Sequence, residues 1–258
     1  MRAMVLAAGR GERLRPLTDR LPKPMVPVAG KPLIDHTLTY LKNCGIREVV
    51  VNLHHLGDMI RKYVGDGRQW GLRVFYSWES SLLGTGGGIQ KASPYLFEDT
   101  FLVVNADILV ELDLQEVVRF HRENNAAVTL VLRRDPEVDR YGVIETDGYG
   151  LVRQFLAKLD VRSGPWNRLM FTGVHVLEPL VFSFMNPPGL SFSIIDVYLA
   201  MLRAGERILG YEMKGFWTDV GTTSRYEDLQ RMLERREIAI DTLVHACGAG
   251  GSSPTEDP

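Results

Sequence analysis

A glycine-rich segment near the N-terminus carries the residues best suited to bind phosphate. Residues 9–13 (GRGER) follow a short apolar run directly, and further cations stand at Arg15 and Lys23. Glycine lets backbone amides approach an anion closely, and amides at positive φ form an anion-binding concavity. Lys23 lies between two prolines, which hold the backbone extended and fix where its side chain starts. The pattern predicts a site for a phosphorylated ligand.

Three interpretations of this glycine-rich segment compete. A dinucleotide-binding fingerprint needs a third glycine where Leu14 stands and a helix immediately afterwards, which Arg15-Pro16 disfavours. A Walker loop needs Gly-Lys-Ser/Thr, which this sequence does not contain. The third interpretation is a glycine-rich connection with solvated arginines, and the glycines alone do not exclude it.

Two aspartates stand just past the ends of expected strands. Asp107 ends the run FLVVNAD, and Asp219 follows Trp217-Thr218 before the last helical segment. Open α/β sheets bind ligands at the carboxyl ends of their strands, so either aspartate could contact a ligand. Each could equally be an ordinary turn or helix-entry residue, and the sequence does not show whether they meet in space.

A second glycine-rich stretch, Glu79 to Ile89 (ESSLLGTGGGI), could let a nucleobase lie against the backbone. Backbone amides and carbonyls would then read the edge of the base. The alternative is a flexible loop followed by the start of a helix.

The elements that must position these residues alternate between strand and helix through the first half. Apolar runs predict strands, and amphipathic spacing predicts helices, the last capped by Asp113. The expected strands are 5–8, 46–53, 72–78, 101–104 and 127–132, and the expected helices are 32–44, 56–64, 86–96 and 113–124. This βαβ spacing predicts a doubly wound α/β sheet.

The second half adds a hairpin, more strands and two helices. Residues 141–145 and 151–155 flank a turn at Asp147-Gly148. Further strands are expected at 169–177, 208–213 and 216–218, and helices at 193–204 and 222–236. Residues 241–258 are expected to be a disordered tail, because 247–258 is rich in glycine, serine and acid. We interpret this half as the second wall of a cleft.

Composition limits the class of protein. The chain has 258 residues, 45% of them hydrophobic, and a formal net charge of -2, so no global basic field attracts nucleic acid. Two cysteines make a disulfide framework unlikely and favour a reducing compartment. The N-terminal apolar run is too short for a signal peptide, and no window is long enough to span a membrane. We expect a soluble, cytoplasmic protein.

The segment LAAGRGERLRPLTDRLPKPMVPVAGKPLI resembles the signature of the sugar-1-phosphate nucleotidyltransferases, also called NDP-sugar pyrophosphorylases. That signature reads L-A-G/A-G-x-G-x-R-L-x-P-L-T and then P-K-P-M/L-V/L-P-V. The match is long and gapless, so it is far more specific than an isolated glycine pair. The resemblance extends from about residue 1 to 233 and is nearest to short bacterial members that act on N-acetylmuramate, mannose or heptose phosphates.

The resemblance implies a role for each of these residues. Arg13 should bind the triphosphate, Lys23 should contact the phosphate at the reacting centre, and Asp107 and Asp219 should hold Mg²⁺. The segment at 79–89 resembles the base-binding stretch E-x-x-P/L-L-x-T-G/A-G. The implied nucleotide-binding residues are Leu6, Ala8, Gly9, Gly11, Glu12, Arg13, Glu79, Leu82, Gly84, Thr85 and Gly86.

The hairpin region resembles the stretch Y-G-V…D…F-x-E-K-P of the same family. The sugar-phosphate contacts that it implies are Asn105, Gly142, Lys158, Thr172 and Gly173. Ala157 stands where the family has an acid and Leu159 where it has proline, so the resemblance does not specify the sugar.

The resemblance therefore implies a Rossmann-like, mostly parallel mixed sheet of the GT-A-like nucleotidyltransferase fold, without a C-terminal β-helix. One domain would span 1–240, with a nucleotide-binding half at 1–133 and a sugar-binding half at 134–240. The expected substrates are UTP or GTP and a sugar 1-phosphate, serving nucleotide-sugar and cell-envelope polysaccharide synthesis in a monomer or small homo-oligomer. Two alternatives stay open, a cytidylyltransferase acting on phosphocholine and a non-catalytic nucleotide-sugar sensor.

Overall fold

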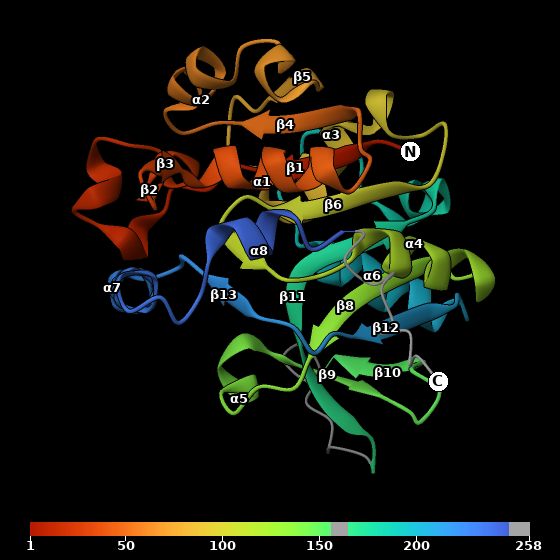
Figure 1. Cartoon of the computed structure of the whole chain (residues 1–258). Helices are drawn as coiled ribbons and strands as arrows, with labels where there is room; N and C mark the ends of the chain where they lie inside the picture. The colour runs from red at the N-terminus through yellow and green to blue at the C-terminus, as the bar shows by residue number, and fades with distance from the viewer. Residues whose placement is uncertain (156–164, 248–258) are drawn as a thin grey trace, which may run out of the picture.

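The computed structural model describes residues 1–155 and 165–247, which form an α/β fold around a nine-stranded mixed sheet (Figure 1). Its first half is a parallel unit in the order β6-β1-β4-β5. The elements of this unit are β1 (Ala3–Leu6), α1 (Leu33–Asn43), β4 (Glu48–Leu53), α2 (Gly57–Val64), β5 (Arg73–Trp78), α3 (Gly84–Lys91) and β6 (Phe101–Asn105).

The second half extends this sheet through antiparallel strands. The long strand β11 pairs with β6, β8 and β9, and β12 adds to β8 in parallel. The main-sheet strands and the longer helices of this half are β8 (Val128–Arg133), β9 (Val143–Thr146), β10 (Val152–Phe155), β11 (Asn167–Leu177), β12 (Ile208–Glu212), α4 (Leu114–Glu123), α6 (Ile194–Arg203) and α7 (Thr223–Glu234).

Two small ribbons lie outside the main sheet. One pairs β7 (Ile108–Val110) with β13 (Trp217–Asp219), and the other pairs β2 (Pro27–Val28) with β3 (Lys31–Pro32). The remaining helices are α5 (Val138–Tyr141), α8 (Ile240–Val244) and short 3₁₀ turns at Glu12–Leu14, Leu17–Asp19, Lys23–Met25, Arg68–Trp70, Ser93–Tyr95 and Pro179–Phe184.

Strand β1 shows why the central strands are continuously apolar. Ala3 and Val5 belong to the hydrophobic cluster under α1 and α4, whereas Met4 belongs to the cluster under α3 and α6. Helices therefore cover both faces of the sheet, so residues in the middle of its central strands are buried whichever face they point to (Figure 1). The prediction of a doubly wound α/β sheet is confirmed.

Most expected elements are found within a few residues of their predicted limits. The Asp113 side chain accepts a hydrogen bond from the backbone N–H of Gln115, which confirms it as the cap of α4. The helix expected at 86–96 instead begins at Gly84 and ends at Lys91, and a 3₁₀ turn containing Pro94 follows. Strand β7 and helix α5 have three and four residues and gave no periodic signal.

The described chain continues past the expected end of the domain at residue 240. Helix α8 packs on α1, its Leu243 and Val244 are buried, and Asn43 Nδ2 donates a 2.8 Å hydrogen bond to the Val244 carbonyl. Residues 241–247 are therefore part of the folded structure, and only 248–258 of the expected tail lie outside the described residues.

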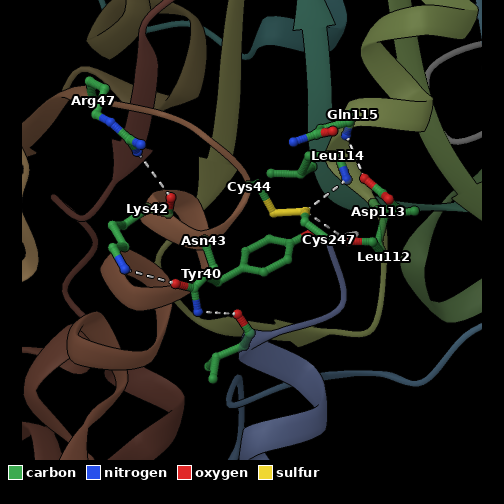
Figure 2. The surroundings of a disulfide bond; sticks show 11 residues. Tyr40, Lys42, Asn43, Cys44, Arg47, Leu112, Asp113, Leu114, Gln115 and Cys247 are labelled. Carbon is green, nitrogen blue, oxygen red and sulfur yellow. Dashed lines mark hydrogen bonds between the residues drawn. A yellow bond between two sulfur atoms is a disulfide. The ribbon is translucent and has the colours of Figure 1, made fainter. Parts of the chain in front are cut away.

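Cys44, which follows α1, and Cys247, which follows α8, form a disulfide with a Cα–Cα distance of 5.0 Å (Figure 2). The sequence made a disulfide framework unlikely, but the two cysteines are bonded to each other, which removes the argument from cysteine usage for a reducing compartment. The partners are 203 residues apart, so only the fold brings them together. In the described part of the chain, no helix has the length and apolar character needed to cross a membrane.

Candidate active site

A cavity of about 580 Å³ opens at the carboxyl edge of the parallel unit. Strand register places Leu6 of β1 opposite Asn52 of β4 and Asn105 of β6, and all three line this cavity. The other lining residues are Ala7, Ala8, Gly9, Arg10, Gly11, Glu12, Arg13, Lys23, Pro24, Leu82, Gly84, Thr85, Ala106, Asp107 and Gly221. The glycine-rich loop, Lys23 and Asp107 therefore all line one cavity.

The glycine-rich loop is folded tightly at Gly11. Its φ is 66°, and a Cβ there would lie 2.9 Å from Thr18 Cγ2, so a side chain would be both strained and crowded. Thr18 Oγ1 donates a 2.7 Å hydrogen bond to the Gly11 carbonyl. Leu14, which stands where a dinucleotide fingerprint has glycine, is fully buried and anchors the loop in an apolar cluster. Only a 3₁₀ turn follows Gly11, in place of the long helix of such a fingerprint.

Lys23 and Asp107 form an ion pair inside the cavity. Pro22 is extended, as the sequence predicted, but Lys23 itself begins a 3₁₀ turn rather than continuing the extended segment. The side chains of Lys23 and Asp107 are 13% and 26% exposed, so both are partly withdrawn from water. The pair places one cation and one anion at the C-terminal end of β6.

The two strand-end aspartates do meet in space. Antiparallel pairing of β13 with β7 sets Asp219 opposite Ile108, and the Val220 N–H donates a 2.7 Å hydrogen bond to the Asp107 carbonyl. Asp219 itself does not line the cavity, but the adjacent Gly221 does. A Cβ on Gly221 would lie 2.4 Å from Asp219 Oδ1 and 3.5 Å from Arg13 Nη2, so the Arg13 guanidinium lies on the same side.

Each of these carboxylates already has a cationic partner. Asp107 pairs with Lys23, and Asp219 Oδ2 accepts a 2.5 Å hydrogen bond from Arg225 Nη1. Two carboxylates from adjacent strands suit Mg²⁺, which commonly takes one or two carboxylates together with substrate phosphate oxygens. In residues 1–155 and 165–247, no three or more His, Cys, Asp or Glu side chains gather as a metal cluster. The residues fit a cation whose coordination is completed by a bound phosphate.

Arg225 was not identified from the sequence. It stands in the first turn of α7, six residues after Asp219, and a cation so close to a strand-end aspartate was the only signal for it. Burial by itself would lower the pKa of Arg225, but the hydrogen bond and the charge of Asp219 outweigh that effect and raise it. The guanidinium is therefore charged throughout the physiological range.

The stretch expected to bind the base divides into two parts. Leu82, Gly84 and Thr85 line the cavity, whereas Gly86 and Glu79 do not. The Gly86 N–H donates to the carbonyl of Phe192, and a Cβ at Gly86 would lie 2.4 Å from the phenyl ring. Gly86 thus allows α3 to pack closely on the segment before α6.

Glu79 lies behind the cavity wall in a buried hydrogen-bond chain. Its side chain accepts from Asn52 Nδ2 at 2.7 Å and from the Leu83 N–H at 3.0 Å, and Asn52 Oδ1 accepts from the Ala7 N–H at 2.7 Å. Glu79 and Asn52 are 4% and 3% exposed. The chain fastens the end of β1, the end of β4 and the 79–84 segment together. Asn52, a polar residue in the apolar run 46–53, was also missed.

The expected sugar-phosphate contacts are only partly brought together. Asn105 lines the cavity. Gly173, at φ 88°, packs so closely against the Asn105 side chain that a Cβ on Gly173 would lie 2.5 Å from Asn105 Nδ2. The buried Thr172 uses its hydroxyl to donate to the Val131 carbonyl, at 2.8 Å. Gly142 follows α5 at φ 93°. Lys158, with Ala157 and Leu159, lies outside the described residues.

Aromatic residues beside the aspartates are paired with arginines. Tyr141 packs edge-on against Trp217 at 5.7 Å, Arg225 lies 4.5 Å from the Tyr141 ring centroid, and Arg133 lies 5.7 Å from the Trp217 ring. Burial, and next the charge of Asp219, raises the pKa of Tyr141. These faces are therefore already occupied by cations, which disfavours them as a cage for the quaternary ammonium of phosphocholine.

Comparison with known proteins agrees with this arrangement. A family model described as "Nucleotidyl transferase" matches residues 2–236. The mannose-1-phosphate guanylyltransferase of Mycobacterium tuberculosis is 37% identical over 222 residues, which are 85% of this chain and 61% of that protein. The N-acetylmuramate alpha-1-phosphate uridylyltransferase of Neisseria meningitidis is 36% identical over 237 residues, 90% of this chain and 98% of that protein.

The fold is also found among solved structures. HddC from Yersinia pseudotuberculosis, complexed with GMP-PN, superposes with a TM-score of 0.73 at 24% identity, and the match covers 90% of this chain and 99% of HddC. This chain spans less than two thirds of the length of the longer curated relatives that it matches.

Proposed function

This chain belongs to the nucleotidyl transferase family, and we propose that it transfers a nucleoside monophosphate from a nucleoside triphosphate to a sugar 1-phosphate. The products are an NDP-sugar and pyrophosphate. The observation that carries the proposal is the convergence of Arg13, Lys23 and Asp107 on one cavity at the carboxyl edge of β1 and β6, beside Asp219. An NDP-sugar is an activated donor of the kind that polysaccharide synthesis consumes.

The reaction needs no general base. The second pKa of a phosphate monoester is about 6, so the attacking oxygen of the sugar phosphate is already largely ionised at pH 7. That oxygen forms a new bond to the α-phosphorus, and the bond from the α-phosphorus to the bridging oxygen breaks. The electron pair leaves with pyrophosphate.

The main difficulty is bringing two anions together in line. Arg13 lines the cavity and is exposed, so its guanidinium can bind the triphosphate and the departing pyrophosphate. Lys23 lies beside Asp107 and can transfer its ammonium from that carboxylate to the reacting phosphate. Mg²⁺ held by Asp107 and Asp219 would supply further charge neutralisation of the phosphate oxygens.

Leu82, Gly84 and Thr85 form the part of the cavity wall that we assign to the base, and Asn105 the part that we assign to the sugar phosphate. Gly173 packs closely against Asn105, and we assign it to the same part of the site. Thr85 cannot read a base freely, because its hydroxyl accepts a 2.9 Å hydrogen bond from the Ile194 N–H. Backbone groups would then dominate base recognition. We propose UTP or GTP, the nucleotides named for the Neisseria and Mycobacterium relatives.

The test is pyrophosphate release over a matrix of UTP, GTP, CTP, dTTP and ATP against glucose, mannose and N-acetylmuramate 1-phosphates with Mg²⁺. At least one pair should turn over, and Asp107→Asn should reduce kcat by about 100-fold or more, as expected when charge stabilisation is lost. Asp228→Asn is the matched control, since Asp228 lies on the exposed face of α7 and pairs only with Arg231 in the described structure.

The competing role, a nucleotide-sugar sensor, has a different signature. A sensor would bind one nucleotide sugar without turnover, and Asp107→Asn would leave that binding unchanged. Absence of pyrophosphate release from every pair, combined with that binding behaviour, would refute the enzymatic proposal.

A further inference from the structure

The Asp219 carboxylate is held on both of its oxygens. Oδ1 accepts a 2.7 Å hydrogen bond from the Gly221 N–H, and Oδ2 accepts the 2.5 Å hydrogen bond from Arg225 Nη1. The side chains of Asp219 and Arg225 are only 14% and 16% exposed. This is a partly desolvated, charge-assisted pair, and such pairs are stronger than surface ion pairs.

Arg225 has other partners that do not depend on Asp219. Its guanidinium lies 4.5 Å from the centroid of the Tyr141 ring, and Arg225 Nη2 lies 3.8 Å from Glu137 Oε2. Both partners belong to α5 or its N-terminal flank. The guanidinium could therefore release Asp219 and still keep an aromatic face and a carboxylate nearby.

We propose that Arg225 is a positioning residue that serves as the resident counter-cation of Asp219 and competes with a divalent cation for that carboxylate. The inference rests on the proposed function, because it takes Asp219 as a cation ligand. In the unliganded protein, Arg225 aims the carboxylate and offsets its charge. When a divalent cation binds, the guanidinium must give up Oδ2 and turn to Glu137, Tyr141 or a substrate phosphate.

The reason for such an arrangement is the proximity of two acids. The Val220 N–H to Asp107 carbonyl hydrogen bond holds the two aspartate backbones side by side, so two uncompensated carboxylates would repel each other. Lys23 offsets the charge of Asp107 and Arg225 that of Asp219. If Asp107 and Asp219 held a divalent cation, Lys23 and Arg225 would be free to neutralise the anionic oxygens of a bound triphosphate.

The experiment measures binding of Mn²⁺ alone, from the electron paramagnetic resonance signal of the free ion, to the full chain without nucleotide. Arg225→Gln should tighten Mn²⁺ binding about tenfold, because it removes the competing charge. Arg225→Lys keeps the charge and should stay within about threefold of the unaltered protein. Arg231→Gln is the matched control, because Arg231 lies on the same helix with an exposed side chain and should change nothing.

Each outcome decides the inference. Unchanged or weaker Mn²⁺ binding by Arg225→Gln, in a variant whose circular dichroism and melting match the parent, overturns it even if pyrophosphate release is normal. Should neither Arg225→Gln nor Arg225→Lys fold, Arg225 is a structural residue and the inference also fails. Asp219→Asn tests whether Mn²⁺ binds at Asp219. If this substitution leaves Mn²⁺ binding unchanged, or if no Mn²⁺ binds, both the inference and the metal part of the proposed function fail. If Arg225→Gln binds Mn²⁺ more tightly but no substrate pair releases pyrophosphate, the inference holds and the proposed function fails.

Discussion

The buried chain from Ala7 through Asn52 to Glu79 makes a sharp prediction about stability. Asn52→Leu has a similar volume but loses both the acceptor for the Ala7 N–H and the donor to Glu79 Oε1, each 2.7 Å away. Leaving a buried neutral donor unpaired costs about 1–3 kcal/mol, and removing the hydrogen-bond donor of a buried carboxylate costs somewhat more. Together these give a loss of about 3–5 kcal/mol of unfolding free energy.

Urea denaturation at pH 7.5 measures this loss directly, provided that the slope of free energy against urea is unchanged. Asn43→Leu is the matched control: Asn43 is only half-buried and loses its hydrogen bond to the Val244 carbonyl and a long, exposed one from Lys42 Nζ at 3.4 Å, so it should cost about 1 kcal/mol. A double-mutant cycle with Glu79→Leu should show favourable coupling, because the double variant leaves only the Ala7 and Leu83 N–H groups unpaired, two fewer groups than the single variants leave together. If Asn52→Leu costs no more than Asn43→Leu, the chain does not hold the cavity wall together.

Three further outcomes are expected. Burial lowers the pKa of His175 from 6.5 to about 3, so its contribution to stability is complete above pH 6.5 and declines as pH falls toward 3. About 2 kcal/mol should be lost between pH 7.5 and 5, and His175→Gln should remove that part of the pH dependence in urea titrations. Leu243→Ala should cost about 2–5 kcal/mol by opening a cavity in the apolar cluster that also contains Leu14, whereas Leu190→Ala, at a site 52% exposed, should cost little in the same assay. Replacing Cys44 and Cys247 together by serine should lower the urea midpoint, with an entropic ceiling of about 5 kcal/mol for a loop of 203 residues.

Local patterns predicted the fold because they coincide with tertiary requirements. The continuous apolar runs of β1, β4 and β6 require helices on both faces, and the clusters on either side of Met4 and Val5 show that arrangement. The cap at Asp113 is a contact between neighbours in sequence, so it too was readable. Helix limits were predicted less well where several glycines follow one another. Helix α3, for example, begins at Gly84, two residues before its predicted start.

The sequence supplied candidate residues for the site but not their geometry. Arg13, Lys23 and Asp107 were named from their motifs and the family resemblance, whereas the approach of Asp219 to Asp107 depends on β7 and β13, which have three residues each and leave no periodic trace. Asn52 looked like one polar interruption in a strand, and only its partners 45 and 27 residues away explain it. Arg225 could not be assigned a partner from helical spacing alone.

The disulfide bond between Cys44 and Cys247 also determines which products proteolysis of this chain gives. Residues 44–247 form a covalent ring that includes most of the sheet, with α1 and α8 meeting at its closure (Figure 2). A single protease nick anywhere from residue 45 to 246 opens the ring but releases no fragment. The nicked protein would keep its full mass on a non-reducing gel and separate into two pieces only after a thiol reductant is added.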